Sequence, residues 1–279
     1  MKYLTTAIFR LGLVAGAVVV AAQGQIPDGP EVCRQAFVLV TSPDRLSVAQ
    51  CRAAVKKTMA AWNFDLKRMG WSNPARTEGA IRLRFLSDER MPSTARALAN
   101  PQGRFTVRMS LIEDPSLDLS FAHELGHIQA FRMLGPRRSE VPDYFLEGHG
   151  LLMNWLYAEQ LGRHHFTEAK TIMGLTAEQA RNFLSPDYDK KHTASMERMG
   201  LFFVEYLRAR EGAPEAATKI GRVFELVGQN RTFEQAFAKV YGLPLKRAIA
   251  DVVALFKRTE ANPAERLKGT CFEEYLPKQ

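Results

Sequence analysis

The sequence predicts an α+β protein: a small mixed sheet and one motif-bearing helix in an N-terminal lobe, followed by a helical C-terminal lobe. Three observations support this class. Short runs of strand-like residues occur only before residue 113. Residues 118–134 carry apolar side chains around most of a helical wheel, and the chain after residue 142 repeats its apolar residues at helical spacing. A mature chain of about 255 residues suits one compact unit with two lobes.

The first 22 residues have the features of a secretory signal peptide. Lys2 and Arg10 precede an uninterrupted apolar run of twelve residues, 11–22. Cleavage is expected after Ala22, with Gly24 as the alternative. Because a membrane span needs about 20 apolar residues, we expect cleavage and no stable span afterwards, with an uncleaved anchor as the alternative. The protein is therefore expected in the periplasm or outside the cell.

The N-terminal lobe, residues 26–134, is expected to mix strands with helices. The expected elements are, in order, a strand at 36–41, a helix at 47–69, strands at 81–86 and 104–112, and a helix at 118–134. Segment 87–103 predicts a surface loop with a short helix, lining the cleft.

Three cysteines allow one intrachain disulfide in an oxidising compartment and leave one thiol over. Cys33 precedes the strand 36–41, whereas Cys51 lies at the start of the helix that runs back from the other end of that strand. The rise of the strand would separate the two by roughly 20 Å, too far for a bridge. We therefore expect Cys271 to be the partner of one of them.

The helix 118–134 has recognisable ends. Asp118 and Ser120 are candidate N-caps, and Gly135-Pro136 is expected to end the helix. After a basic, polar loop, Pro142 is well placed to open the next helix.

This helix carries the sequence His123-Glu-Leu-Gly-His127. Its two histidines lie one turn apart on one face, so both imidazoles can bind one metal ion. Glu124 stands beside the first of them, where it can act on a metal-activated water. Glu147, twenty residues after His127, can return to the metal from the next helix. Three protein ligands with one open position are typical of catalytic zinc.

The C-terminal lobe, residues 135–279, is predicted to be helical. Its expected helices span 143–161, 177–183, 192–209, 214–226, 232–240 and 245–258. After residue 263 we expect either an extended segment held by Cys271, Phe272 and Tyr275, or a loose tail.

The motif and its spacing resemble the gluzincin branch of the zincin metallopeptidases. Segment 141–148 is similar to the P-x-W-x-x-E-G stretch of secreted bacterial peptidase-MA-like proteins, and segments 200–212 and 233–245 are similar to their later helices. The resemblance covers roughly residues 105–256. It implies a zincin-like fold, Zn²⁺ held by His123, His127 and Glu147, and Glu124 as general base. It also implies that strand 104–112 is the edge strand that pairs with an extended substrate.

The chain departs from the family pattern near the third ligand. Leu151 stands where thermolysin-like gluzincins carry an acid that orients a ligand histidine, so that support must come from elsewhere. The stretch Glu147-Gly-His-Gly150 replaces the usual E-G-x-A. His149 faces the other side of its helix and is expected to pack or to support a ligand rather than bind metal.

No tyrosine in the helix leading to Leu207 suggests itself as an oxyanion stabiliser. Tyr188 and His192 are the candidates for donating a hydrogen bond to the developing oxyanion. The competing interpretation is that they belong to an ordinary polar loop. His164 and His165 are expected in an exposed loop.

The formal charge is +8, or +6 once Lys2 and Arg10 leave with the signal peptide. Basic residues are scattered and not clustered with aromatic ones, which argues against nucleic acid as a partner. A basic surface in the cell envelope would meet anionic lipid, glycan or acidic protein.

The sequence therefore predicts an exported zinc-dependent metallopeptidase acting on protein or peptide substrates. One alternative is a non-catalytic envelope binding or scaffold protein on a zincin fold. Another is a zinc amidase that acts on peptidoglycan.

Overall fold

The computed structural model describes residues 30–43, 46–71, 81–87, 89, 97–100, 102–111, 117–163, 167–186, 194–212 and 216–275. The signal peptide predicted for residues 1–22 lies outside these ranges. Within them, no helix is both long enough and apolar enough to cross a membrane.

Over the described residues, the sheet has five strands. Their order is β1 (Glu31–Gln35), β2 (Val38–Thr41), β3 (Ile81–Leu86), β5 (Arg104–Arg108) and β4 (Ala97–Ala99). The three central strands are parallel, and β1 and β4 run antiparallel to their neighbours. The α+β class and the mixed sheet are therefore confirmed.

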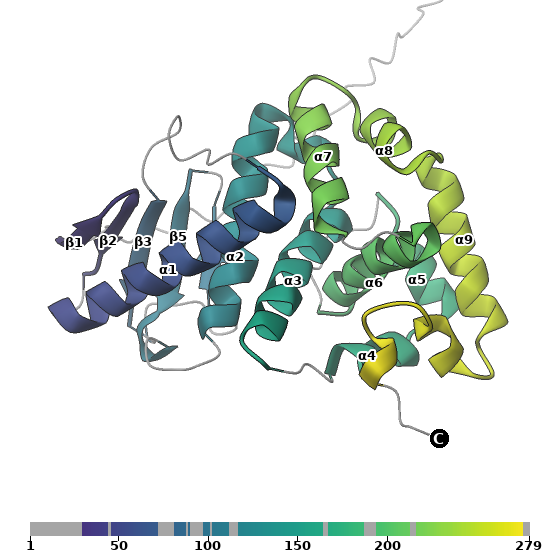
Figure 1. Ribbon diagram of the computed structural model, residues 1–279, viewed down its shortest axis with the longest axis horizontal. Helices are drawn as coiled ribbons and strands as arrows, with labels where there is room; N and C mark the ends of the chain where they lie inside the picture. The colour runs from purple at the N-terminus through teal and green to yellow at the C-terminus, as the bar shows by residue number, and fades with distance from the viewer. Residues whose placement is uncertain are drawn as a thin grey trace, which may run out of the picture.

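Alternation along the strands gives the sheet one apolar face. In β3, Ile81, Leu83 and Phe85 are fully buried, whereas Arg82 is exposed. Figure 1 shows α1 (Val48–Met69) running across the strands, with α2 (Leu117–Leu134) beside it and the remaining helices beyond. The buried face thus supports the two helices of this half of the molecule.

The prediction for the sheet edge was wrong. Strand 104–112 ends at Arg108 and passes into a 3₁₀ turn, Met109–Leu111. Residues 97–99, predicted as part of a loop, form β4 and cover the outer side of β5. A three-residue strand is too short for an alternation signal, and its pairing depends on the turn around Asn100.

The disulfide prediction was also wrong, because Cys33 pairs with Cys51 and Cys271 is free. The chain reverses at Ala36, whose φ of 50° is left-handed, so β1 folds back along β2. Cys33 then lies opposite Val40, near the end of β2 that leads to α1. The two cysteine Cα atoms are 6.3 Å apart. Only one strand, 36–41, was expected where β1 and β2 form a hairpin.

The first two helices are tied to each other and to Arg163, which follows α3 (Asp143–Gln160). The expected helix at 47–69 is α1, with Ser47 and Gln50 forming a capping box. Asp118 does not cap α2 as predicted; it lies in the first turn and pairs with Lys57 at 3.1 Å and Arg163 at 3.5 Å.

The start of α2 was thus placed slightly late, since Ser120 also lies inside the helix. Its end agrees with prediction, because Gly135 takes a left-handed φ of 55° directly after Leu134.

All but one of the remaining helices in the described residues agree with the predicted ones within a few residues. They are α3 (Asp143–Gln160), α4 (Thr167–Gly174), α5 (Ala177–Phe183), α6 (Ala194–Glu211), α7 (Ala217–Gly228), α8 (Phe233–Tyr241) and α9 (Leu245–Arg258). Only α4 was not predicted. Capping boxes begin α5 and α8, through Thr176 with Gln179 and Thr232 with Gln235.

Helix α3 crosses α6 at two glycines. A Cβ on Gly148 would lie 2.4 Å from the Gly200 carbonyl carbon, and one on Gly200 would lie 2.0 Å from the Tyr144 carbonyl oxygen. Neither helix could approach this closely with any other residue at the crossing. The contact therefore fixes α3 along its length.

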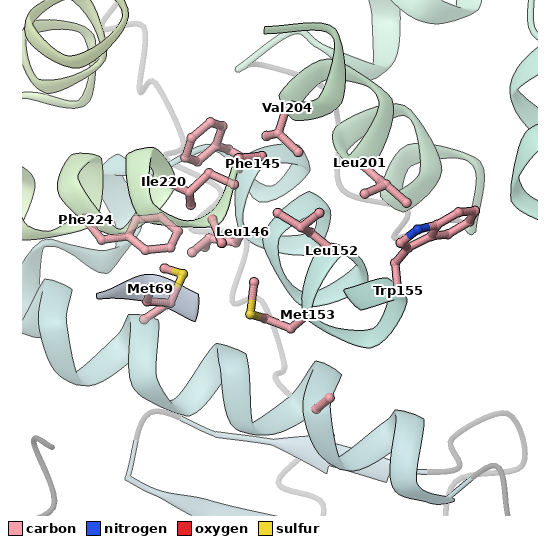
Figure 2. Packing of buried hydrophobic residues seen from close by; sticks show 14 of the residues in the cluster. Met69, Phe145, Leu146, Leu152, Met153, Trp155, Leu201, Val204, Ile220 and Phe224 are labelled. Carbon is pink, nitrogen blue, oxygen red and sulfur yellow. The ribbon is translucent and has the colours of Figure 1, made fainter. Parts of the chain in front are cut away.

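Buried apolar residues form one continuous cluster from the sheet through the helices. Figure 2 shows its centre, where Leu152 of α3 lies beside Leu201 of α6, and Phe224 of α7 lies near Phe145 of α3 and Met69 of α1. The division into lobes at residues 134 and 135 stays a prediction, since the cluster continues across it.

The C-terminal segment is neither extended nor loose over the described residues. It folds into short 3₁₀ turns, Pro263–Leu267 and Glu273–Tyr275. Phe272 is fully buried against Trp155 and Phe202, so this segment is part of the core.

We expect Cys33→Ser with Cys51→Ser to lower the free energy of unfolding by about 3 kcal/mol, because the bridge closes a loop between residues 18 apart. Denaturant titration with and without reductant measures this. The reductant should destabilise the wild type and leave the double variant unchanged. Equal stability of wild type and double variant would contradict the disulfide.

Candidate metal centre

Helices α2 and α3 bring together the three side chains predicted as metal ligands. His123 Nε2 and His127 Nε2 lie 3.0 Å apart. Glu147 Oε2 lies 3.1 Å from the His127 nitrogen and 3.5 Å from the His123 nitrogen. These residues form a group whose ligand atoms all lie within 4.8 Å of one another. As predicted, α3 therefore brings Glu147 back to the two histidines of α2.

The spacing of these atoms suits a small cation. In a tetrahedral zinc site with bonds of about 2.0–2.1 Å, neighbouring ligand atoms lie roughly 3.3–3.4 Å apart. The three distances of 3.0, 3.1 and 3.5 Å lie around that value. Two imidazole nitrogens and one carboxylate oxygen form a donor set that zinc accepts.

Gly150 makes room for the two imidazoles. A Cβ at this position would lie 2.8 Å from both Cε1 and Nε2 of His127 and 3.1 Å from Cε1 of His123. The stretch Glu147-Gly-His-Gly150 thus has two glycines with separate physical roles. Gly148 admits α6 on one side of α3, and Gly150 admits the histidines of α2 on the other.

The charges in the group favour a protonated histidine and an ionised glutamate. Burial alone would lower the pKa of His123, but a hydrogen bond to Glu147 and nearby carboxylates raise it above its ordinary value. Burial would raise the pKa of Glu147, yet the two histidines lower it strongly. A cation bound at this position would stabilise the Glu147 carboxylate in place of the protonated histidine.

Of the two histidines in the ligand group, His127 is the more enclosed, with 5% of its surface exposed. Its ring stacks on Phe131 at 5.8 Å between centroids, and Arg138 lies over Phe131 at 4.1 Å. Its Nδ1 is buried and has no hydrogen-bond partner among the described residues. No described side chain therefore orients His127 in the way that an acid at position 151 would.

Glu124 lies beside the ligand group without joining it. Its Oε2 accepts a hydrogen bond of 2.8 Å from the backbone N–H of Ala99 in β4. Glu197 of α6 lies close enough to raise the pKa of His123. Sequence reasoning missed both neighbours, because a backbone amide leaves no signal in the sequence and Glu197 belongs to no motif.

His149 packs beneath the motif helix. It is fully buried, its Nε2 donates to the Gly126 carbonyl at 3.3 Å, and its ring meets Phe224 edge-on at 5.2 Å. Burial lowers the pKa of His149 to about 3, so the ring is neutral. It is not in the ligand group, in agreement with its expected packing role.

Four predicted positions lie outside the described residues. Tyr188 and His192, the oxyanion candidates, belong to segment 187–193, and His164 and His165 to segment 164–166. Their roles stay predictions.

A cavity of about 300 Å³ opens at the start of α3, one helical turn before Glu147. Its apolar lining includes Val141, Leu146, Phe183 and Met196.

Comparison of the chain with protein-family models and with curated proteins finds no match. The resemblance to gluzincins therefore stays a prediction from the sequence.

We expect Gly150→Ala to weaken zinc binding by at least about tenfold, because the added methyl group displaces both imidazoles. Gly174→Ala is the matched control, since a Cβ there meets no heavy atom within 4 Å. Equilibrium competition with a chromogenic zinc chelator measures the affinity. Equal affinities in both variants would contradict the role assigned to Gly150.

Proposed function

We propose that this protein is an exported zinc-dependent metallopeptidase of gluzincin type with a zincin-like fold. The observation that carries the proposal is the convergence of His123, His127 and Glu147, while Glu124 stays outside the ligand group and within the same site. A purely structural zinc site commonly uses four protein ligands and has no use for a separate carboxylate.

The three ligand residues would hold the metal and leave one position open. Zinc bound in this way supplies Lewis-acid chemistry, because it lowers the pKa of a coordinated water toward neutrality and polarises a carbonyl. Glu124 takes the proton from the attacking water and delivers it to the leaving amine as the C–N bond breaks. His192 and Tyr188 remain the candidates for stabilising the oxyanion.

Protein or peptide is the proposed substrate class. The cavity before Glu147, whose walls are both apolar and polar, is the candidate site for one substrate side chain. By the family resemblance an extended peptide would pair with the sheet edge, which is β4 and not the expected strand 104–112.

Export is supported by the Cys33–Cys51 disulfide, since such bonds persist mainly in oxidising compartments. The signal-like features of residues 1–22 point the same way.

One observation favours the alternative of a non-catalytic binding protein. His127 Nδ1 has no partner among the described residues, whereas ligand histidines in active zinc enzymes are usually oriented by an acceptor.

We expect Glu124→Gln to reduce turnover by at least about 100-fold while zinc stays bound, because the amide cannot carry the proton. The assay uses zinc-loaded mature protein with dye-quenched unfolded casein, and Glu178→Gln on the surface of α5 is the control. Metal content is measured on the same samples.

Turnover of Glu124→Gln within tenfold of the wild type would contradict its assigned role. Cleavage of muropeptides but not of casein would favour the peptidoglycan amidase. A zinc-loaded wild type that cleaves neither would favour the binding protein.

A further inference from the structure

The candidate general base is tethered to the edge of the sheet. Ala99 is the last residue of β4, and its N–H donates to Glu124 Oε2 over 2.8 Å. Among the strands that the structure describes, β4 is the outermost on this side. The bond therefore joins the motif helix to a sheet edge that would otherwise present a free amide.

The Ala99 amide is available because of the strand register. In an antiparallel pair, successive residues direct their N–H groups alternately toward the partner and away from it. Asn100, the next residue, donates its N–H to the Arg104 carbonyl at 2.9 Å and so faces the β5 side. Ala99 consequently points its N–H away from β5 and toward α2.

The turn after Ala99 holds this donor in place. The side-chain oxygen of Asn100 accepts from the backbone N–H groups of Gln102 at 3.1 Å and Arg104 at 2.9 Å. Gly103 completes the turn with a φ of 73°, which favours glycine, and its carbonyl accepts from Arg82 of β3 at 2.9 Å. Ala99 thus precedes a turn that is fixed to β5 and to β3.

We propose that the Ala99 N–H is a positioning group for Glu124, an inference that rests on the proposed function. It engages Oε2 and leaves Oε1 to exchange a proton with the substrate water and the leaving amine. It also holds the carboxylate away from the cation position, although Glu124 is the direct neighbour of His123. Ligand and base roles are thereby divided between Glu147 and Glu124.

Hydrogen exchange on the metal-free mature protein tests the bond without any assay of catalysis. In the wild type, the Ala99 amide should exchange slowly despite its place on an edge strand. Glu124→Ala should speed its exchange by at least about tenfold, whereas Glu124→Gln, which keeps an acceptor oxygen, should keep it slow. The Asn100 amide, bonded within the hairpin, should remain protected in all three proteins.

Ala99 exchange that is unchanged in Glu124→Ala would overturn the proposal. Loss of protection at both Ala99 and Asn100 would also count against it, because the variant would then have loosened the hairpin and not one bond.

Ala99→Pro tests the consequence for catalysis. Proline removes the N–H, and an outward-facing amide of an edge strand is the position where a sheet tolerates it. Ala99→Val is the matched comparison, since it adds similar bulk and keeps the donor. With dye-quenched casein, the kcat of the proline variant should lie at least about tenfold below that of the valine variant at equal zinc content.

Wild-type kcat in Ala99→Pro, or a rise in KM alone, would overturn the positioning role. The two parts of the test separate the inference from the proposed function. If no variant and no wild type shows turnover, hydrogen exchange still decides whether Ala99 holds Glu124.

Discussion

The candidate metal centre depends on how closely α3 packs against α2 on one side and α6 on the other. At Gly148 the backbone of α3 meets that of α6, and at Gly150 the helix meets the imidazoles of α2. These two glycines lie on opposite sides of the same turn, directly after Glu147. A larger residue at either position would push α3 away from the neighbouring helix. The distances between the ligand atoms would then change, because well-packed interiors transmit strain instead of absorbing it.

The remaining structure can be understood as support for that arrangement. The disulfide and the pairing of Asp118 with Lys57 fix α1 and the beginning of α2 relative to the sheet. At the sheet edge, β4 supplies the backbone N–H of Ala99 to Glu124, and the turn between β4 and β5 holds that strand in place. Under the proposed function, the metal ligands would come from α2 and α3, and the sheet edge would orient the general base.

Most helices and the ligand group were predictable from the sequence, because periodicity and capping residues indicate where helices begin and end. Pro142 before α3 and the spacing from His127 to Glu147 were enough to expect the three-ligand group. The hairpin at Ala36 and the short β4 were not, since both depend on long-range pairing and not on local pattern. The disulfide prediction was wrong because the hairpin was not predicted. The hydrogen bond from Ala99 to Glu124 was missed because β4 was not predicted.

Zinc content measured by mass spectrometry on purified mature protein tests the central claim most directly, with Glu147→Ala compared and the surface variant Glu178→Ala as control. The account predicts about one zinc per chain in the wild type and the control, and its loss in Glu147→Ala. A wild type without zinc after careful reloading, or equal zinc in Glu147→Ala, would contradict a three-ligand centre built by α2 and α3.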